Sequence, residues 1–117
     1  MTDDKLQKTM LFDFFGDLLT DKQREYYDLY HNEDLSLSEI AENVGITRQG
    51  VFDIILRAEN VMLLTEQKTG IIKRFTEMQT EIAKAVSLAE EIMQQTNDEE
   101  TVAKTIKLVD LLSSLKG

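Results

Sequence analysis

Five side chains between positions 47 and 57 are of the kinds that contact nucleic acid. An arginine can donate to guanine or to a phosphate, and a glutamine can pair with adenine. A threonine at the start of a helix can hold a phosphate together with the free backbone N–H groups there. An exposed phenylalanine can contact a thymine methyl group or another protein. These residues form a candidate nucleic-acid interface: Thr47, Arg48, Gln49, Phe52 and Arg57.

The rest of the chain offers little to an enzyme or a metal site. It has no cysteine, one histidine and no glycine-rich phosphate loop. That histidine, His31, has no recognisable nucleophile near it in the sequence, and we interpret it as a residue at a helix C-terminus that interacts with the last carbonyls. The acidic run Asp98, Glu99, Glu100 does not form a ligand set, because adjacent helical residues point in different directions. We therefore expect no enzyme, no cofactor and no metal ion.

The candidate interface requires a helix-turn-helix, and residues 36–57 have the pattern of one. Ser36 and Glu39 form a capping box for the first helix. Gly45 supplies the positive φ of a tight turn, and Thr47 is placed to cap the second helix. The alanine of the first helix is small enough for a close crossing. The inward face would consist of Leu37, Ile40, Ala41, Val44, Ile46, Val51, Ile54 and Ile55.

Two further helices are expected before this motif. Residues 6–19 carry a wide apolar stripe at spacings of three and four, which either packs in the core or docks another chain. A capping box at Thr20 and Gln23 begins a helix from Asp21 to about His31. Three of its side chains would pack on the motif, with the tyrosine hydroxyls reaching the surface: Tyr26, Leu29 and Tyr30.

From position 71 onward the apolar spacing alternates between four and three over about three heptads. Gly70 either ends the preceding helix at about Gln67 or kinks it. Thr96 or Asn97 would cap a last helix, which makes a long antiparallel hairpin. The heptad residues predict a homodimer interface, the alternative being that they pack onto the N-terminal bundle. They are Ile71, Phe75, Met78, Ile82, Ala85, Ala89 and Ile92.

Composition favours an all-α protein with a helix-turn-helix bundle in residues 1–70 and amphipathic helices in residues 71–117. The chain has 117 residues, of which 42% are hydrophobic and 30% charged, and it has no proline. The net charge is −9, with acidic excess at both ends and balance in residues 36–75, so few side chains are available for phosphate contacts. No apolar run is long enough to span a bilayer, and the first residues are polar, so we expect a cytoplasmic protein.

The segment LTDKQREYYDLYHNEDLSLSEIAENVGI resembles the entry to region 4 of bacterial sigma factors. Extended through ITRQGVFDIILRAENVM, it is similar to the YlxM family of helix-turn-helix proteins of low-GC Gram-positive bacteria. This resemblance covers about two thirds of the chain. The residues that carry it are Ser36, Glu39, Ile40, Ala41, Gly45, Ile46, Arg48, Gln49, Val51, Asp53 and Arg57.

The family resemblance implies a winged-helix-free, sigma region 4-like fold and a regulatory protein. It also implies a gene beside those of the signal recognition particle pathway, and hence a role in that pathway by association. This chain departs from sigma region 4 by placing Phe52, Asp53 and Ile54 where basic residues are common. The leading hypothesis is a dimeric regulator that binds duplex DNA. The alternative is a non-enzymatic module that binds a protein or a ribonucleoprotein, such as the signal recognition particle, and keeps the fold without reading DNA.

Overall fold

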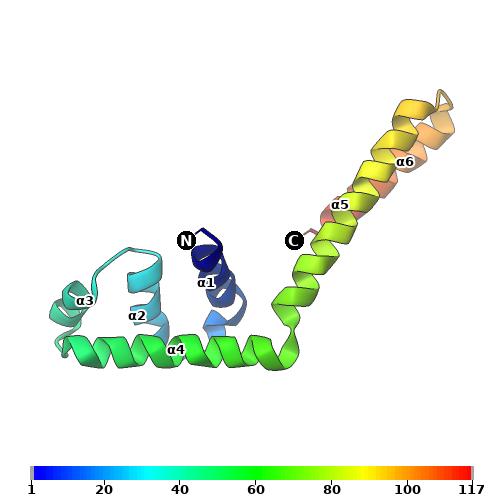
Figure 1. The fold of residues 1–117 in the computed structure, drawn as a ribbon. Coiled ribbons are helices and arrows are strands. Elements are labelled where there is room, and N and C mark those ends of the chain that lie inside the picture. Colours follow the sequence, from blue (N-terminus) through cyan, green and yellow to red (C-terminus); the bar gives the residue numbers. More distant parts are fainter. Residues whose placement is uncertain (1, 117) are drawn as a thin grey trace. The chain divides into compact units, whose positions relative to one another are not determined.

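The computed structural model describes residues 2–116, and within that range it is helical with no strand, which confirms the all-α prediction (Figure 1). The chain forms two compact units, Met1–Ile72 and Lys73–Gly117, called here the N-terminal unit and the hairpin. The elements are α1 (Thr2–Phe15), the 3-10 helix η1 (Gly16–Leu18), α2 (Asp21–His31), α3 (Leu37–Val44), α4 (Arg48–Thr69), α5 (Ile71–Gln95) and α6 (Glu99–Ser114).

The two capping boxes expected from the sequence are both present. The Gln23 backbone N–H donates to Thr20 Oγ1 at 3.2 Å, and the Thr20 N–H donates to Gln23 Oε1 at 3.0 Å. Ser36 and Glu39 make the same reciprocal pair at 3.0 and 2.9 Å. Each box satisfies N–H groups that the first turn of a helix leaves without partners, so α2 and α3 begin where the sequence predicts.

The first helix differs from the expected span of residues 6–19. It begins earlier, at Thr2, and its α-helical part ends at Phe15, where η1 takes over. A 3-10 turn has 3.0 residues instead of 3.6, which rotates the following side chains relative to a continuous helix. Leu19 follows η1 in an extended conformation (φ −80°, ψ 153°) and is buried with Leu11 and Phe15, whereas Leu18 is exposed.

The core of the N-terminal unit lies where α1, α2 and α3 pack on one side of α4 (Figure 1). Tyr27 is fully buried at its centre, and its ring stacks on Phe12 of α1 at a centroid distance of 5.5 Å. The Tyr27 hydroxyl is buried too, because α1 covers the side of α2 away from the helix-turn-helix (Figure 1). The buried cluster is Leu11, Phe15, Leu19, Tyr26, Tyr27, Ile40, Ala41, Val51, Ile55, Ala58 and Met62.

Gly70 ends α4 and does not kink a continuous helix. It has a positive φ of 64°, and its N–H donates to the Glu66 carbonyl at 2.8 Å, so the last turn closes on itself. The helix runs two residues past the expected end at Gln67. Immediately afterwards, the Ile72 N–H donates to Glu66 Oε1 at 2.8 Å, and the Ile72 side chain packs on the core.

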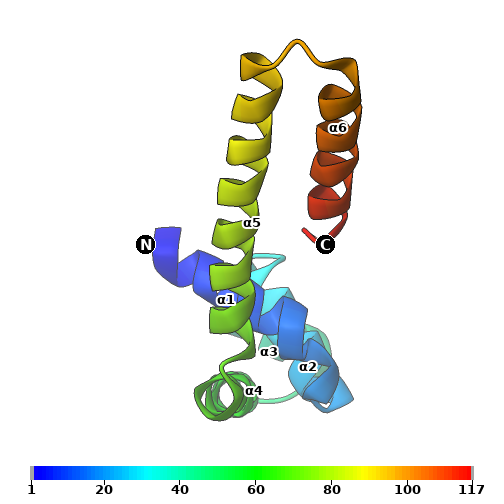
Figure 2. The ribbon, with the colours of Figure 1, turned by 90° about the vertical axis from the view of Figure 1, so that its right-hand side faces the viewer.

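The hairpin consists of α5 and α6 running antiparallel (Figure 2). Gln79 Nε2 donates to the Lys116 carbonyl at 3.2 Å, which joins α5 to the end of α6. The cap of α6 is Asp98, not Thr96 or Asn97 as expected. Its carboxylate accepts from both the Thr101 N–H and the Thr101 hydroxyl, at 3.0 and 2.7 Å, whereas the Thr96 hydroxyl accepts the Asp98 N–H. These bonds lower the pKa of Asp98.

Candidate nucleic-acid interface

The turn of the helix-turn-helix depends on backbone conformation at Gly45. This residue has a φ of 79°, and a Cβ built there would meet nothing within 4 Å. Glycine is needed for its left-handed φ and not for space. The Gly45 and Ile46 N–H groups both donate to the Ala41 carbonyl, at 2.9 and 3.3 Å, which closes the end of α3. The turn therefore sets the start of α4 at a fixed place relative to α3.

The start of α4 is capped as predicted, and it faces solvent. Thr47 Oγ1 accepts the Gly50 N–H at 3.0 Å. A Cβ at Gly50 would lie 3.1 Å from that oxygen, so the glycine leaves room for the cap. Thr47, Arg48 and Gln49 are all exposed. Together with the positive end of the helix dipole, these residues make a surface to which an anion can bind.

Gln49 is held by a neighbour on its own helix. Its Nε2 donates to Asp53 Oδ1 at 3.0 Å, one turn further along α4. The bond fixes the side-chain direction of Gln49 and occupies one of its donors. It also places a carboxylate on the face that would approach DNA, as the sequence indicated.

Ion pairing of the two candidate arginines would decide whether they are available to a ligand. Among the residues that the structure describes, neither Arg48 nor Arg57 pairs with Asp53 or Glu59. Asp53 accepts from Gln49 instead, and Glu59 faces α1 and α2. Both guanidinium groups are exposed and available to a partner.

The five candidate residues do not share one face of α4. Phe52 follows Arg48 by four residues and lies on nearly the same side of the helix, next to Gln49. Arg57 follows Arg48 by nine residues, which is half a turn in excess of two full turns. The structure thus brings together Thr47, Arg48, Gln49 and Phe52 and places Arg57 apart from them.

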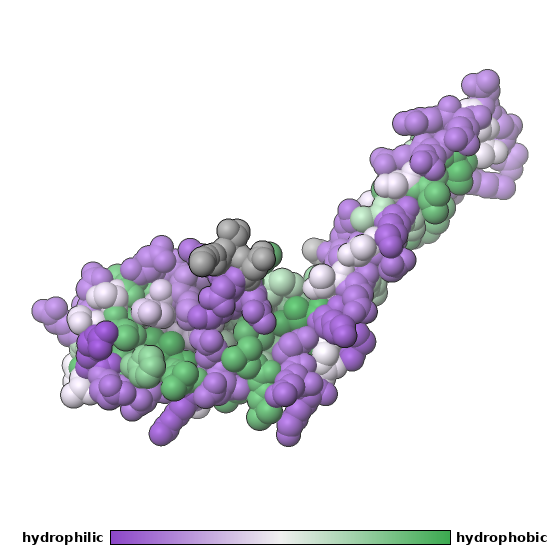
Figure 3. All heavy atoms as spheres, viewed as in Figure 1, coloured by the Kyte–Doolittle hydropathy of each residue, from purple (hydrophilic) through white to green (hydrophobic). Residues whose placement is uncertain are grey.

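An exposed apolar stripe along α4 was not singled out from the sequence. It consists of Phe52, Leu56 and Leu63, with exposed fractions of 42, 45 and 39%, at spacings of four and seven residues. Apolar surface is visible over α4 in Figure 3. The signal that would have revealed it is an apolar pattern on α4 too wide for one buried face. We call these three residues the α4 stripe.

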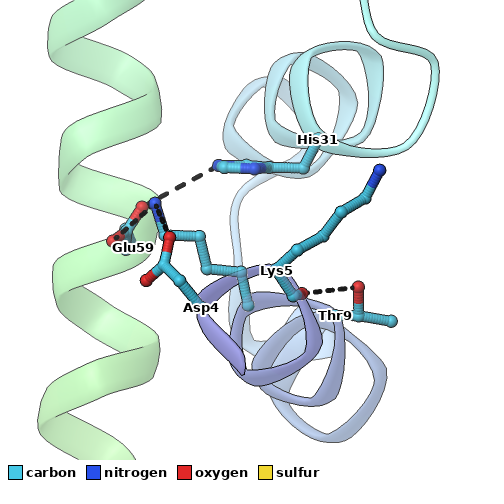
Figure 4. A network of polar contacts seen from close by, with 6 residues as sticks. Asp4, Lys5, Thr9, His31 and Glu59 are labelled. Atoms are coloured by element: carbon cyan, nitrogen blue, oxygen red, sulfur yellow. Dashed lines mark hydrogen bonds and ion pairs between the residues drawn. The ribbon is translucent and has the colours of Figure 1, made fainter. Parts of the chain in front are cut away.

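A polar network beside the α4 stripe joins three helices (Figure 4). Glu59 Oε1 of α4 lies 3.8 Å from Lys8 Nζ of α1, which lies 3.6 Å from Asp4 Oδ2. His31 Nε2 of α2 lies 3.9 Å from Glu59 Oε2. The interpretation of His31 as a simple helix C-terminal residue was therefore incomplete, because its partner is 28 positions away in the sequence.

The environment of His31 keeps its ring neutral near pH 7. Burial lowers its pKa, and the nearby Lys8 ammonium lowers it further, against the smaller opposing effect of Glu59. The contact with Glu59 is thus not an ion pair at that pH. The imidazole also packs on the rings of Tyr27 and Tyr30, at centroid distances of 4.2 and 5.0 Å. Burial raises the pKa of the Tyr27 hydroxyl, which keeps it protonated.

The candidate dimer residues fall into groups with different environments. Ile82 and Ala89 are buried within the hairpin, and Phe75 and Ala85 are half-buried. Met78 and Ile92 are exposed. Ile71 is exposed as well but belongs to the N-terminal unit. Some of the heptad residues therefore form the contact between α5 and α6, and others face outward.

Charge and composition of the site bear on its ligands. Residues 1–72 carry seven basic and fourteen acidic side chains, a net charge of −7. Among the described residues, no three histidine, aspartate or glutamate side chains gather as a metal site would require. In the same part of the chain, no helix has the length and apolar character needed to cross a membrane.

These features define a helix-turn-helix protein. The chain belongs to the UPF0122 family, described as "Putative helix-turn-helix protein, YlxM / p13 like", which it matches over residues 2–109. UPF0122 proteins from Thermoanaerobacter sp. (strain X514) and Caldanaerobacter subterraneus are 44% identical over 100 residues and 49% identical over 84 residues. These matches cover 86% and 72% of this chain and the same shares of the relatives. A UPF0122 protein of Bacillus cereus (strain Q1) is 40% identical over 86% of this chain and 91% of its own length.

Proposed function

We propose that the protein is a non-enzymatic regulator that binds duplex DNA through the start of α4 and acts in the signal recognition particle pathway. The observation that supports DNA binding best is the exposed, capped N-terminus of α4, with Arg48 and Gln49 beside the cap. In helix-turn-helix proteins the second helix enters the major groove, and its N-terminal residues contact base edges. The position of Gly45 and Ala41 in the turn is consistent with that mode of docking.

In such a complex each residue of the group has a separate task. Thr47 and the first N–H groups of α4 would hold a phosphate, and Arg48 would donate to guanine in the groove. Gln49 would contact adenine after exchanging its bond to Asp53. Phe52 would lie against a thymine methyl group. Arg57, half a turn away, would contact only the DNA backbone.

The pathway part of the proposal follows from the family. The resemblance to YlxM proteins implies a gene beside those of the signal recognition particle. A regulator in that position would bind the DNA that controls those genes, or the RNA or the protein of the particle itself. The binding experiment below therefore includes all three as separate ligands.

A second candidate function rests on a different observation, the α4 stripe. DNA contact at the start of α4 involves only Phe52 among these three exposed apolar side chains, because Leu56 and Leu63 lie further along the helix. The net charge of −7 on the N-terminal unit also favours a basic protein over a polyanion. In this alternative the helix-turn-helix is a scaffold for a protein or ribonucleoprotein partner.

The test is a binding measurement with the full-length protein at two salt concentrations. Its ligands are random duplex DNA fragments, signal recognition particle RNA and the particle's protein subunit. Salt-sensitive selection of a short DNA sequence is the expected result. Absence of DNA binding at low salt, together with binding of the particle's protein, would overturn the DNA proposal in favour of the second candidate.

Variants assign the contacts. Arg48→Ala should weaken DNA binding, change the selected sequence and reduce the slope of log affinity against log salt by about 0.9. Arg57→Ala should reduce the slope without changing the selected sequence. Lys104→Ala, in the hairpin, is the control that leaves both unchanged. If a protein is the ligand, Phe52→Ala and Leu56→Ala should weaken binding more than Arg48→Ala does.

A further inference from the structure

The hairpin buries little of its apolar surface within itself. Of its described residues, only Ile82, Ala89 and Thr105 are buried. Six large apolar side chains remain exposed along one side of the two helices. A folded unit of this size that leaves so much apolar area in water usually gains stability from a partner. The exposed residues in question are Met78, Leu88, Ile92, Leu108, Leu111 and Leu115.

In α5 the exposed residues lie to one side of the contact with α6. Ile82 and Ala89 mark the line that faces α6. At 100° per residue, Met78, Leu88 and Ile92 lie 30–110° away from that line, all in the same rotational sense. Leu88 has the largest exposed fraction of the three, 62%. These residues form one continuous stripe beside the α5–α6 contact.

In α6 a matching stripe lies on the same side of the hairpin. Measured from the buried Thr105, Leu108, Leu111 and Leu115 are rotated by 60–120° in the same sense as the stripe on α5. Because the helices are antiparallel, equal rotations in the same sense bring both stripes to one face. The opposite face of the hairpin shows a single exposed large apolar residue, Ile106, among the described residues.

We propose that this face of the hairpin binds the same face of a second copy of the chain, which makes a four-helix bundle. The charges along its two edges favour a second copy as the occupant. The outer edge of α5 has an acidic excess of one, with Glu77, Glu81 and Glu91 against Lys73 and Lys84, whereas the outer edge of α6 has a basic excess of one, with Lys104 and Lys107 against Glu100. A two-fold axis parallel to the helices places α5 of each copy opposite α6 of the other, so that unlike edges meet.

The size of the face corresponds to a small dimer interface, below the standard size. With sixteen residues, α6 is about 24 Å long, and two helices side by side are about 20 Å wide. This face offers several hundred square ångströms per copy, and α5 extends beyond α6. A standard interface buries about 800 Å² per partner. The seam positions Ile82 and Ala89 stay inside each hairpin, and the outward positions Met78 and Ile92 meet the partner.

The experiment is a mass measurement of the full-length protein by sedimentation equilibrium at 50 μM. The wild-type chain should have twice its monomer mass of 13.4 kDa. Leu111→Glu, at the most exposed of the six positions, should give the monomer mass, and so should Leu88→Glu. Circular dichroism of each variant verifies that the helices are retained.

The matched control is Ile106→Glu, which introduces the same charge on the same helix at a residue that is 48% exposed but on the opposite face. It should remain dimeric. A monomeric wild-type protein at this concentration, or a dimer that survives both Leu88→Glu and Leu111→Glu, would overturn the proposal. So would a control that dissociates while Leu111→Glu does not.

If the substituted chains unfold, the dimer can be tested with the wild-type protein alone. The melting temperature of a dimer rises with protein concentration, because a higher concentration favours the associated, folded state over the unfolded chain. Thermal unfolding of the wild-type protein followed at 1 and 100 μM should show such a rise in the transition. An unchanged melting temperature would overturn the dimer and assign this face to another partner.

Discussion

The N-terminal unit and the hairpin differ in how much of the apolar surface of their helices they bury. In the N-terminal unit three helices pack on one side of α4 and bury a contiguous cluster of eleven residues. In the hairpin two helices of comparable length bury three residues among those described. A helix that meets several others loses water from most of its apolar surface, whereas a helix with one neighbour keeps an apolar stripe exposed. The first unit is therefore stabilised internally, and we expect the second to gain stability from the proposed association.

This difference separates the surfaces available for function. The N-terminal unit exposes a helix N-terminus, the side chains of Arg48 and Arg57, and the α4 stripe. The hairpin exposes a long apolar face with charged edges. Polar recognition needs side chains held rigidly by a packed core, and self-association needs apolar area. Changes in stability and in assembly should accordingly respond to different residues.

The largest expected effect comes from the core of the N-terminal unit. Met62 is fully buried, so Met62→Ala should lower the free energy of unfolding of this unit by about 2–5 kcal/mol. All three tyrosines lie in this unit and the chain has no tryptophan, so tyrosine fluorescence in urea reports its unfolding alone. The neighbouring Leu63→Ala, at an exposed position, is the control and should change little. Equal losses for the two variants would contradict the packing described.

Gly45→Ala should have the next largest effect. The free energy of unfolding of the N-terminal unit should fall by about 1–2 kcal/mol, because a Cβ disfavours the φ of 79° although it has space. Gly45→Asn should cost less, since asparagine tolerates the left-handed region better. Urea unfolding by tyrosine fluorescence measures both. If the alanine variant is as stable as wild type, backbone strain at the turn is not what fixes the start of α4.

Local rules predicted a large part of this fold from the sequence. Both capping boxes, the turn at Gly45 and the cap at Thr47 were correct, because each depends on residues within four positions of one another. The cap of α6 was placed on the wrong residue. Thr96, Asn97 and Asp98 are all good caps, and only the geometry of the connection selects the carboxylate that reaches Thr101.

What the sequence did not predict depends on contacts between distant positions. The burial of Tyr27 follows from α1 covering the far side of α2, and the Glu59 network joins α1, α2 and α4. In the candidate interface the residue types were identifiable. The separation of Arg57 from Arg48 follows from helix geometry alone, but the outward direction of Leu56 could be seen only once the orientation of α4 in the core was known. The partner of the heptad residues in α5 could not be predicted either. Heptad spacing does not distinguish a helix of the same chain from a helix of another chain.

Equivalent caps in the two units offer a smaller and more selective test. Thr47→Ala and Asp98→Ala should each cost about 1 kcal/mol, because each removes an acceptor from a helix N-terminus. The first should lower the midpoint seen by tyrosine fluorescence, and the second should lower only that seen by circular dichroism. Thr47→Ser, which keeps the hydroxyl, should behave as wild type. A shift of the fluorescence midpoint by Asp98→Ala would show that the two units unfold together.

The smallest expected effect is a pH dependence confined to the N-terminal unit. Because burial lowers the pKa of His31 in the folded state, the unfolded chain binds a proton more readily once the pH falls below the ordinary value of about 6.5. Stability should therefore decrease from pH 7.5 to pH 5.5, and His31→Gln should remove most of that decrease. The shifted carboxyl groups of Glu39 and Asp98 have lowered pKa values, so they act only at more acidic pH. A tyrosine-detected transition that falls equally in both proteins would show that the half-buried imidazole is not the group responsible.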